Sequence, residues 1–235
     1  MKTNIQEGFA DNNGIKIHYI AINTNTNEIP LLLVPGMTNS ANEIVEDLSE
    51  HNFERYTIHI SIRGRGKSQS PESGYSFANQ VSDINAVVNH LKIKELYLYG
   101  HSVGSSFAIA YASQNENVKA LIMGDYPPFY PPFSEEWSKK VLANEDRDIS
   151  DKATIAIGKE AEVTNLLREL KELKCPRLML RGGKEGSLFK AGDADYLGKV
   201  IPEIEMQVLE ESKHDLLEPS PKAFIKTVNN FIANI

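Results

Sequence analysis

Length, composition and charge limit what this chain can be. Its 235 residues, 41% of them hydrophobic, suffice for one well-buried core but not for two full domains and a linker. The net charge of −7 and the pI near 5.4 argue against a nucleic-acid partner, which would require a basic face. The single cysteine, Cys175, excludes an internal disulfide and fits a reducing compartment.

Apolar runs in the sequence are short. Leu31 to Val34 is typical, far below the roughly 18 residues that a membrane helix needs, and no signal-peptide pattern follows Met1. We therefore expect a cytoplasmic protein without a membrane partner. Gly66-Lys67-Ser68 matches the tail of a phosphate-binding loop, but Ser61 stands where that motif needs glycine. We expect no nucleotide, no other cofactor and no metal.

Strand patterns dominate the predicted elements. Residues 14–22 alternate in hydrophobicity as a half-buried strand does, and Asn13-Gly14 predicts a tight turn from an earlier strand. Continuously apolar runs follow, as in parallel strands that are buried on both faces, at residues 31–34, 57–62, 95–99, 119–123, 177–180 and 205–209.

Helical patterns lie between these strands. Ser40 with Glu43 resembles a capping box, apolar residues between 77 and 91 recur at helical spacing, and Ser220-Pro221 predicts the start of a terminal helix. A hairpin followed by strand–helix units predicts an α/β fold in one domain, 1–235, with a mostly parallel eight-stranded sheet and helices on both faces.

About fifty residues interrupt the alternation. Between Asp125 and Cys175 no strand is predicted, only a proline- and aromatic-rich stretch at 126–133 and helical patterns around 135–145 and 158–173. We interpret residues 126–175 as an insertion that lies over the edge of the sheet as a small helical lid.

The strand at 95–99 leads into Gly100-His101-Ser102-Val103-Gly104 and then into a helix-compatible run. G-x-S-x-G between a strand and a helix is typical of a nucleophile elbow, in which a sharp turn projects the serine hydroxyl from the sheet. The flanking glycines leave room for neighbouring backbone, and the helix N-terminus and the Val103 N–H face a developing oxyanion. The pattern predicts Ser102 as a nucleophile; an ordinary strand–helix turn is the alternative.

With this motif the chain resembles the α/β-hydrolase superfamily over nearly its whole length. Pro35-Gly36-Met37 resembles the family's His-Gly-x oxyanion loop, which implies the Met37 N–H as the second oxyanion donor beside Val103. Residues 61–68 resemble the family's Asp-x-Arg-Gly-x-Gly-x-Ser segment, with Ser61 in place of aspartate. That position is normally structural, so the departure bears on local stability more than on catalysis.

A serine hydroxyl needs a base, and His214 is the favoured one. It follows the last strand and precedes the terminal helix, where the resemblance places the catalytic histidine, so the order serine, acid, histidine is kept. His101, inside the elbow, is expected to line the pocket. The remaining histidines are expected to pack in or near core elements: His18, His51, His59 and His90.

Two residues compete for the role of the acid that orients the histidine. Asp125 directly follows the strand after the elbow, whereas Glu185 lies at the family's commoner place after the penultimate strand. We favour Asp125 slightly, because Glu185 lies in a glycine-flanked, charged loop. Asp215, next to His214, is expected to face solvent.

The resemblance implies a serine hydrolase that cleaves an ester or related acyl bond of a small, mostly apolar molecule. The same skeleton supports C–C hydrolase, lyase and cofactor-free peroxidase chemistry, and a ligand-sensing protein with a preserved triad is the alternative from another class. The natural substrate and the oligomeric state stay open. Aromatic residues of the insertion either line an apolar pocket or only pack the lid onto the sheet: Tyr126, Phe129, Tyr130, Phe133 and Trp137.

Overall fold

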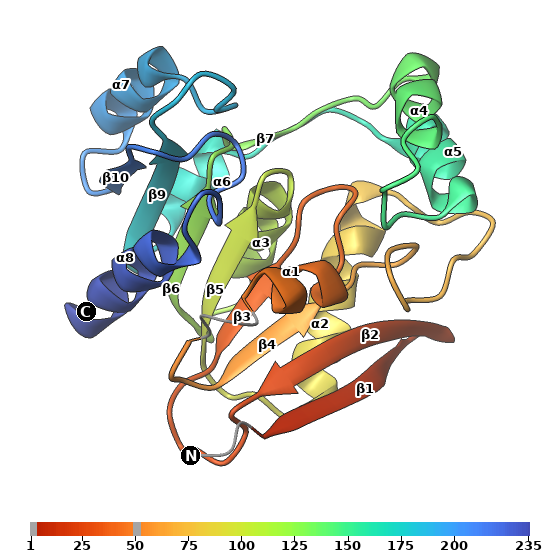
Figure 1. Cartoon of the computed structure of the whole chain (residues 1–235), viewed down its shortest axis with the longest axis horizontal. Helices are drawn as coiled ribbons and strands as arrows, with labels where there is room; N and C mark the ends of the chain where they lie inside the picture. The colour runs from red at the N-terminus through yellow and green to blue at the C-terminus, as the bar shows by residue number, and fades with distance from the viewer. Residues whose placement is uncertain (1–3, 49–52) are drawn as a thin grey trace.

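An eight-stranded sheet forms the centre of the computed structural model, which describes residues 4–48 and 53–235 (Figure 1). The first two pairs, β1–β2 and β2–β4, are antiparallel, and all later pairs are parallel. The predicted α/β fold class is confirmed. In spatial order the strands are β1 (Ile5–Asn12), β2 (Ile15–Ile22), β4 (Thr57–Ile60), β3 (Leu31–Val34), β5 (Leu96–His101), β6 (Val118–Gly124), β9 (Arg177–Gly182) and β10 (Glu205–Leu209).

Helices cover both faces of this sheet (Figure 1). Successive side chains of a strand point to opposite faces, so Leu33 of β3 packs in one core cluster and Leu32 in the other. The Leu33 face is covered by α1 (Ala41–Asp47) and α8 (Pro221–Ala233). The Leu32 face is covered by α2 (Phe77–His90), α3 (Gly104–Gln114), α6 (Leu167–Glu172) and α7 (Ala191–Val200). No helix within the described ranges has the length and apolarity to cross a membrane.

Local signals explain where the helices begin. The predicted capping box of α1 is present, because Ser40 Oγ accepts the Asn42 N–H and Glu43 Oε2 accepts the Ser40 N–H at 2.8 Å. Pro221 opens α8 as predicted, although the Ser220 side chain makes no capping hydrogen bond.

The insertion between β6 and β9 differs in detail from its prediction. Helices α4 (Glu135–Leu142) and α5 (Asp151–Glu160) stand side by side beyond the ends of the parallel strands (Figure 1). The helical pattern expected around 158–173 is divided between two helices: Ser150 caps α5 earlier in the chain, and α6 is separate. Two short strands, β7 (Phe129–Tyr130) and β8 (Thr164–Asn165), pair where no strand was expected, because partners distant in sequence create the ladder.

Backbone hydrogen bonds tie the start of α5 to the loops that follow β3 and β4. The Asp148 N–H donates to Thr38 O at 3.2 Å, and the Gly66 N–H donates to Asp148 O at 2.9 Å. The Ser150 N–H donates to Gly64 O at 2.9 Å. These bonds hold one end of the insertion against the carboxyl edge of the sheet.

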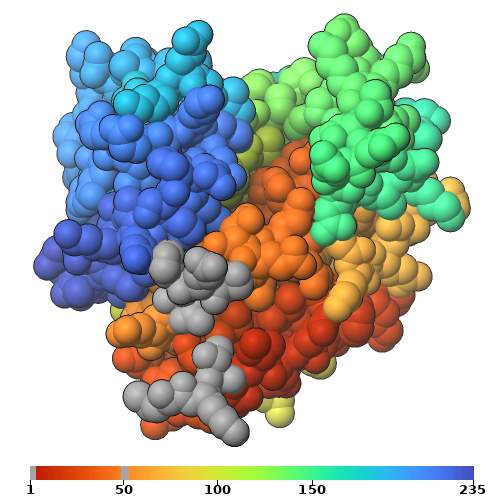
Figure 2. All heavy atoms as spheres, in the orientation of Figure 1, coloured from red at the N-terminus to blue at the C-terminus, as the bar shows by residue number. Residues whose placement is uncertain are grey.

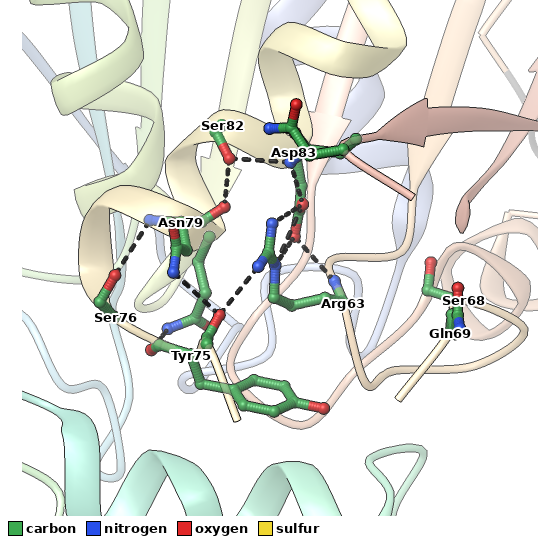
Figure 3. A network of polar contacts seen from close by, with 12 residues as sticks. Arg63, Ser68, Gln69, Tyr75, Ser76, Asn79, Ser82 and Asp83 are labelled. Carbon is green, nitrogen blue, oxygen red and sulfur yellow. Dashed lines mark hydrogen bonds and ion pairs between the residues drawn. The ribbon is translucent and has the colours of Figure 1, made fainter. Parts of the chain in front are cut away.

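The segment after β4 is held by a buried ion pair and by Ser61. The Arg63 guanidinium pairs with both oxygens of Asp83, at 2.7 and 2.9 Å, and Asp83 also accepts the Arg63 N–H (Figure 3). Ser61, the departure from the usual aspartate, is fully buried. Its Oγ accepts the Ala41 N–H at 3.0 Å and its carbonyl accepts the Ser68 hydroxyl at 2.6 Å, so serine still links this loop to α1.

Candidate active site

The strand register gathers the candidate site residues at one edge of the sheet. Val34 of β3 lies opposite Gly100 of β5, and His101 of β5 lies opposite Gly124 of β6. Because these strands are parallel, the residues after their carboxyl ends become neighbours. The oxyanion loop, the elbow and Asp125 therefore lie side by side, and the connection from β10 to α8 brings His214 to the same edge.

Ser102 occupies a strained turn. Its φ is +52°, in the left-handed region that costs a non-glycine residue roughly 1–2 kcal/mol, and its N–H donates to Gly124 O at 2.8 Å. A Cβ on Gly104 would lie 2.4 Å from Pro35 O, and one on Gly100 would lie 2.4 Å from Gly104 O. Both glycines of the motif are thus required by close backbone approaches.

Ser102, His214 and Asp125 form one chain of hydrogen bonds. Ser102 Oγ lies 2.9 Å from His214 Nε2, and His214 Nδ1 lies 2.8 Å from Asp125 Oδ2. Glu185, the alternative acid, is exposed and makes no hydrogen bond to His214. The structure therefore brings together the predicted nucleophile, the predicted base and the favoured candidate for the acid, and it leaves Glu185 outside.

Asp125 is surrounded by donors. It is fully buried, and besides His214 it accepts the Gly182 N–H at 3.1 Å, the Leu188 N–H at 2.8 Å and the Ser187 hydroxyl. Burial raises the pKa of the Asp125 carboxyl, but the hydrogen bonds from His214, Ser187 and the two backbone N–H groups outweigh it and hold the pKa below its usual value. Asp125 therefore stays ionised at neutral pH and accepts the Nδ1 proton of the imidazole.

The loop after β9 thus holds Asp125 in place and does not itself supply a carboxylate to His214. Sequence reasoning missed Ser187 and Gly182, because nothing in their neighbours marks a contact with a residue more than fifty positions earlier. A Cβ on Gly182 would lie 1.9 Å from Lys213 O, so only glycine lets the segment that carries His214 pass so close. The paired glycines in this loop are the one signal of a close approach.

The residues of the two predicted oxyanion donors line the same cavity as the serine. Met37 and Val103 line the cavity with Ser102, and Val103 directly precedes the first turn of α3. No acceptor for the Met37 N–H or the Val103 N–H is found among residues 4–48 and 53–235. Two backbone donors beside a helix N-terminus can bind a developing negative charge.

A cavity of about 470 Å³ lies over Ser102. It corresponds to the recess in Figure 2 between the residues near 140 in green and the C-terminal part in blue. The insertion contributes three aromatic side chains to its lining, those of Tyr126, Phe133 and Trp137. A mostly apolar cavity of this size fits a small molecule.

Two of the aromatic residues predicted for the pocket do not line it. Tyr130 is fully buried, with its ring centroid 4.7 Å from that of Phe77 and 5.6 Å from that of Phe107. Phe129 lies on a separate groove beside Tyr196 of α7. Of the two alternatives for these residues, the pocket lining is wrong for Phe129 and Tyr130, because the β7–β8 pairing turns this stretch toward α2, α3 and α7 instead of toward Ser102.

His101 lines the cavity next to the base. Its ring centroid is 5.0 Å from that of His214, and its Nδ1 lies 3.2 Å from the Tyr99 hydroxyl. Burial, and to a smaller degree His214, lower the pKa of His101 to about 4, so this imidazole is neutral at neutral pH. Burial holds the pKa of Tyr99 well above its usual value, so the phenol keeps its proton and can donate to His101.

The other histidines have different surroundings. His18 is buried against Glu7 and Ser61, His59 is buried beside Thr57, and neither His18, His59 nor His90 lines the cavity. His51 lies outside the described residues.

The charged residues of the otherwise mostly apolar cavity lining are acidic. Glu43, Asp47 and Asp215 contribute to it, and the described lining contains neither lysine nor arginine. Asp215 is exposed, as expected, while it borders the cavity. Burial, and then the nearby charges of Asp215 and Glu218, raise the pKa of the Asp47 carboxyl. The shift in this direction indicates that no nearby cation offsets the negative charges around Asp47.

Comparison with known proteins agrees with this architecture. The sequence model of the alpha/beta hydrolase fold family matches residues 29–165. N-formylmaleamate deformylase of Pseudomonas putida is 32% identical over 145 residues, which are 60% of this chain and 52% of that protein. The match thus spans about half the length of this relative. The 2-(acetamidomethylene)succinate hydrolase of Mesorhizobium japonicum is 21% identical over 86% of this chain and 88% of its own.

The fold also resembles that of solved structures. An esterase from Exiguobacterium antarcticum superposes with a TM-score of 0.76 at 22% identity, covering 97% of this chain and all of the esterase chain. Identity at this level supports the shared fold and leaves the substrate open.

Proposed function

This chain belongs to the alpha/beta hydrolase fold family, and on that premise we propose that it is a serine hydrolase that cleaves an ester or related acyl bond of a small, mostly apolar molecule. The observation that carries the proposal is the continuous hydrogen-bonded chain from Ser102 through His214 to Asp125, placed in a cavity of about 470 Å³. We also infer that residues 126–175 form the lid of a single-domain enzyme.

The first half-reaction follows from these positions. His214 Nε2 takes the proton of the Ser102 hydroxyl, 2.9 Å away, while Ser102 Oγ attacks the carbonyl carbon of the substrate. The ionised Asp125 holds Nδ1 protonated, which leaves Nε2 as the acceptor, and stabilises the imidazolium that forms. The N–H groups of Met37 and Val103 bind the oxyanion of the tetrahedral intermediate.

Loss of the alcohol completes the first half-reaction: the imidazolium gives its proton to the leaving alcohol, the carbonyl re-forms, and the acyl group stays on Ser102 Oγ. The second half-reaction regenerates the serine. Water then enters, His214 Nε2 takes one of its protons, and the resulting nucleophile attacks the acyl carbon. Collapse of the second tetrahedral intermediate returns the proton to Ser102 and releases the acid.

Replacing the nucleophile tests the proposal. Ser102→Ala should lower the hydrolysis of p-nitrophenyl acetate by at least about 10³-fold at an unchanged melting temperature, because the hydroxyl is exposed to the cavity and fills little space. Ser113→Ala, which removes a hydroxyl from the exposed end of α3, the helix that follows Ser102, is the matched control and should keep full activity. Full activity in the Ser102 variant would refute the assignment.

A fluorophosphonate distinguishes the enzyme from the ligand-sensing alternative. An enzyme should incorporate one label per chain at Ser102, found by peptide mass spectrometry, and should turn over short aryl esters many times before labelling. A sensor should bind the ester stoichiometrically and release almost no product.

A further inference from the structure

Arg65 holds the residue that supplies one of the proposed oxyanion donors. Its side chain is almost wholly buried, at 1% exposure. The guanidinium Nε donates to Met37 O at 2.9 Å, Nη2 points at Met37 Sδ, and Nη1 donates to Arg63 O at 2.7 Å. One cation therefore contacts both the main chain and the side chain of Met37.

The charge of Arg65 lacks a carboxylate partner in the part of the chain that the structure describes. Its neighbour Arg63 is neutralised by Asp83, so that carboxylate is already in use (Figure 3). Burial lowers the pKa of Arg65 to about 10, which still leaves the group cationic at neutral pH. A buried, unpaired cation is costly, and an apolar side chain of similar size would fill the space at less cost.

The backbone around Arg65 is fixed independently of its side chain. Arg65 forms a β-bridge with Ile149, just before α5, and its N–H donates to Ile62 O at 3.1 Å. The guanidinium therefore holds Met37 from a backbone position that is itself fixed. Because Met37 lies in a loop without regular structure, the orientation of its N–H depends on such a support.

We propose that Arg65 is a positioning residue for the oxyanion hole: it fixes the Met37 main chain so that the Met37 N–H points at the developing oxyanion, and it adds positive potential there. The proposal rests on the serine-hydrolase function proposed above. A donor held in place before reaction stabilises the transition state more than the neutral ground state. Arg65 should consequently act on kcat and on the binding of anionic tetrahedral adducts, and hardly on KM.

The test compares two buried arginines. Arg65→Met removes the charge at similar volume, and Arg65→Lys keeps the charge but loses the fixed geometry of the guanidinium. Arg177→Met is the matched control, because Arg177 is also buried and donates to main-chain carbonyls, those of Leu170 and Lys171, away from the cavity. Each variant is measured for kcat and KM on p-nitrophenyl acetate, for melting temperature, and for the Kd of an arylboronic acid, which forms an anionic adduct with a serine.

We expect Arg65→Met to lower kcat by about 10- to 100-fold and to weaken boronate binding by a similar factor, with KM changed less than threefold. Arg65→Lys should recover part of both losses, and Arg177→Met should lower only the melting temperature. Unchanged kcat and boronate binding in folded Arg65→Met, whatever its melting temperature, would overturn the inference. If the Met variant does not fold, Arg65→Lys carries the test with the same readouts. Absence of Ser102-dependent turnover in the wild type would instead overturn the proposed function itself.

Discussion

Asp125→Asn is the substitution that tests most directly how His214 is oriented. It keeps the size of the side chain and removes the charge 2.8 Å from Nδ1. For charge centres about 4 Å apart, an effective dielectric constant near 20 corresponds to roughly 4 kcal/mol between carboxylate and imidazolium. At about 1.4 kcal/mol per factor of ten, turnover should fall by about 10³-fold. The amide also favours the wrong imidazole tautomer, which acts in the same direction.

The same substitution should destabilise the fold. The donors of Gly182, Ser187 and Leu188 all point at the carboxylate, whereas an amide offers one acceptor oxygen and a nitrogen that meets a donor. One buried donor left without a partner costs about 1–3 kcal/mol of the free energy of unfolding. Chemical denaturation of Asp125→Asn and wild type at neutral pH measures this loss.

Steady-state hydrolysis of p-nitrophenyl acetate gives the kinetic result, at a temperature where circular dichroism shows each variant folded. Glu185→Gln is the control and should change kcat less than twofold, because an exposed carboxylate without a contact to His214 acts only through a screened field. A larger loss in Glu185→Gln than in Asp125→Asn would refute the reasoning and move the acid to the loop after β9.

Three further predictions concern the cavity and the core. Aryl acetates and butyrates should be hydrolysed at least tenfold faster than aryl esters of long-chain acids, measured as kcat/KM, because the cavity holds only about 470 Å³. An aryl hemisuccinate should have a kcat/KM roughly tenfold below that of the matching butyrate, since repulsion from Glu43, Asp47 and Asp215 of about 1–2 kcal/mol opposes an anionic acyl group; equal values would contradict this. Burial lowers the pKa of His59 to about 3, below its value near 6.5 in the unfolded chain. The unfolded chain therefore binds the proton more readily, and the free energy of unfolding decreases as the pH falls from about 6.5 toward 3. Between pH 7 and 5 the contribution of His59 to this loss should be about 2 kcal/mol, measured in urea unfolding as the smaller pH dependence of His59→Asn relative to wild type.

The nucleophile elbow and the base could be predicted from the sequence because their requirements are local. The sharp turn at Ser102 needs glycine at 100 and 104, and the clashes that a Cβ would cause at both positions explain that pattern. His214 was identified by its place between the last strand and the terminal helix, and the strands themselves by short, continuously apolar runs.

The carboxylate partner of His214, the pocket lining and the proposed role of Arg65 depend on contacts between residues distant in sequence. Asp125 and Glu185 both follow the ends of neighbouring strands, and only the path of the His214 segment over Gly182 places the imidazole against Asp125. Tyr130 has the composition of a pocket residue, yet the pairing of β7 with β8 turns it into the core. A local sequence pattern indicates which backbone conformation a segment can adopt. Strand order and loop packing, which only the tertiary structure shows, determine which side chains come into contact.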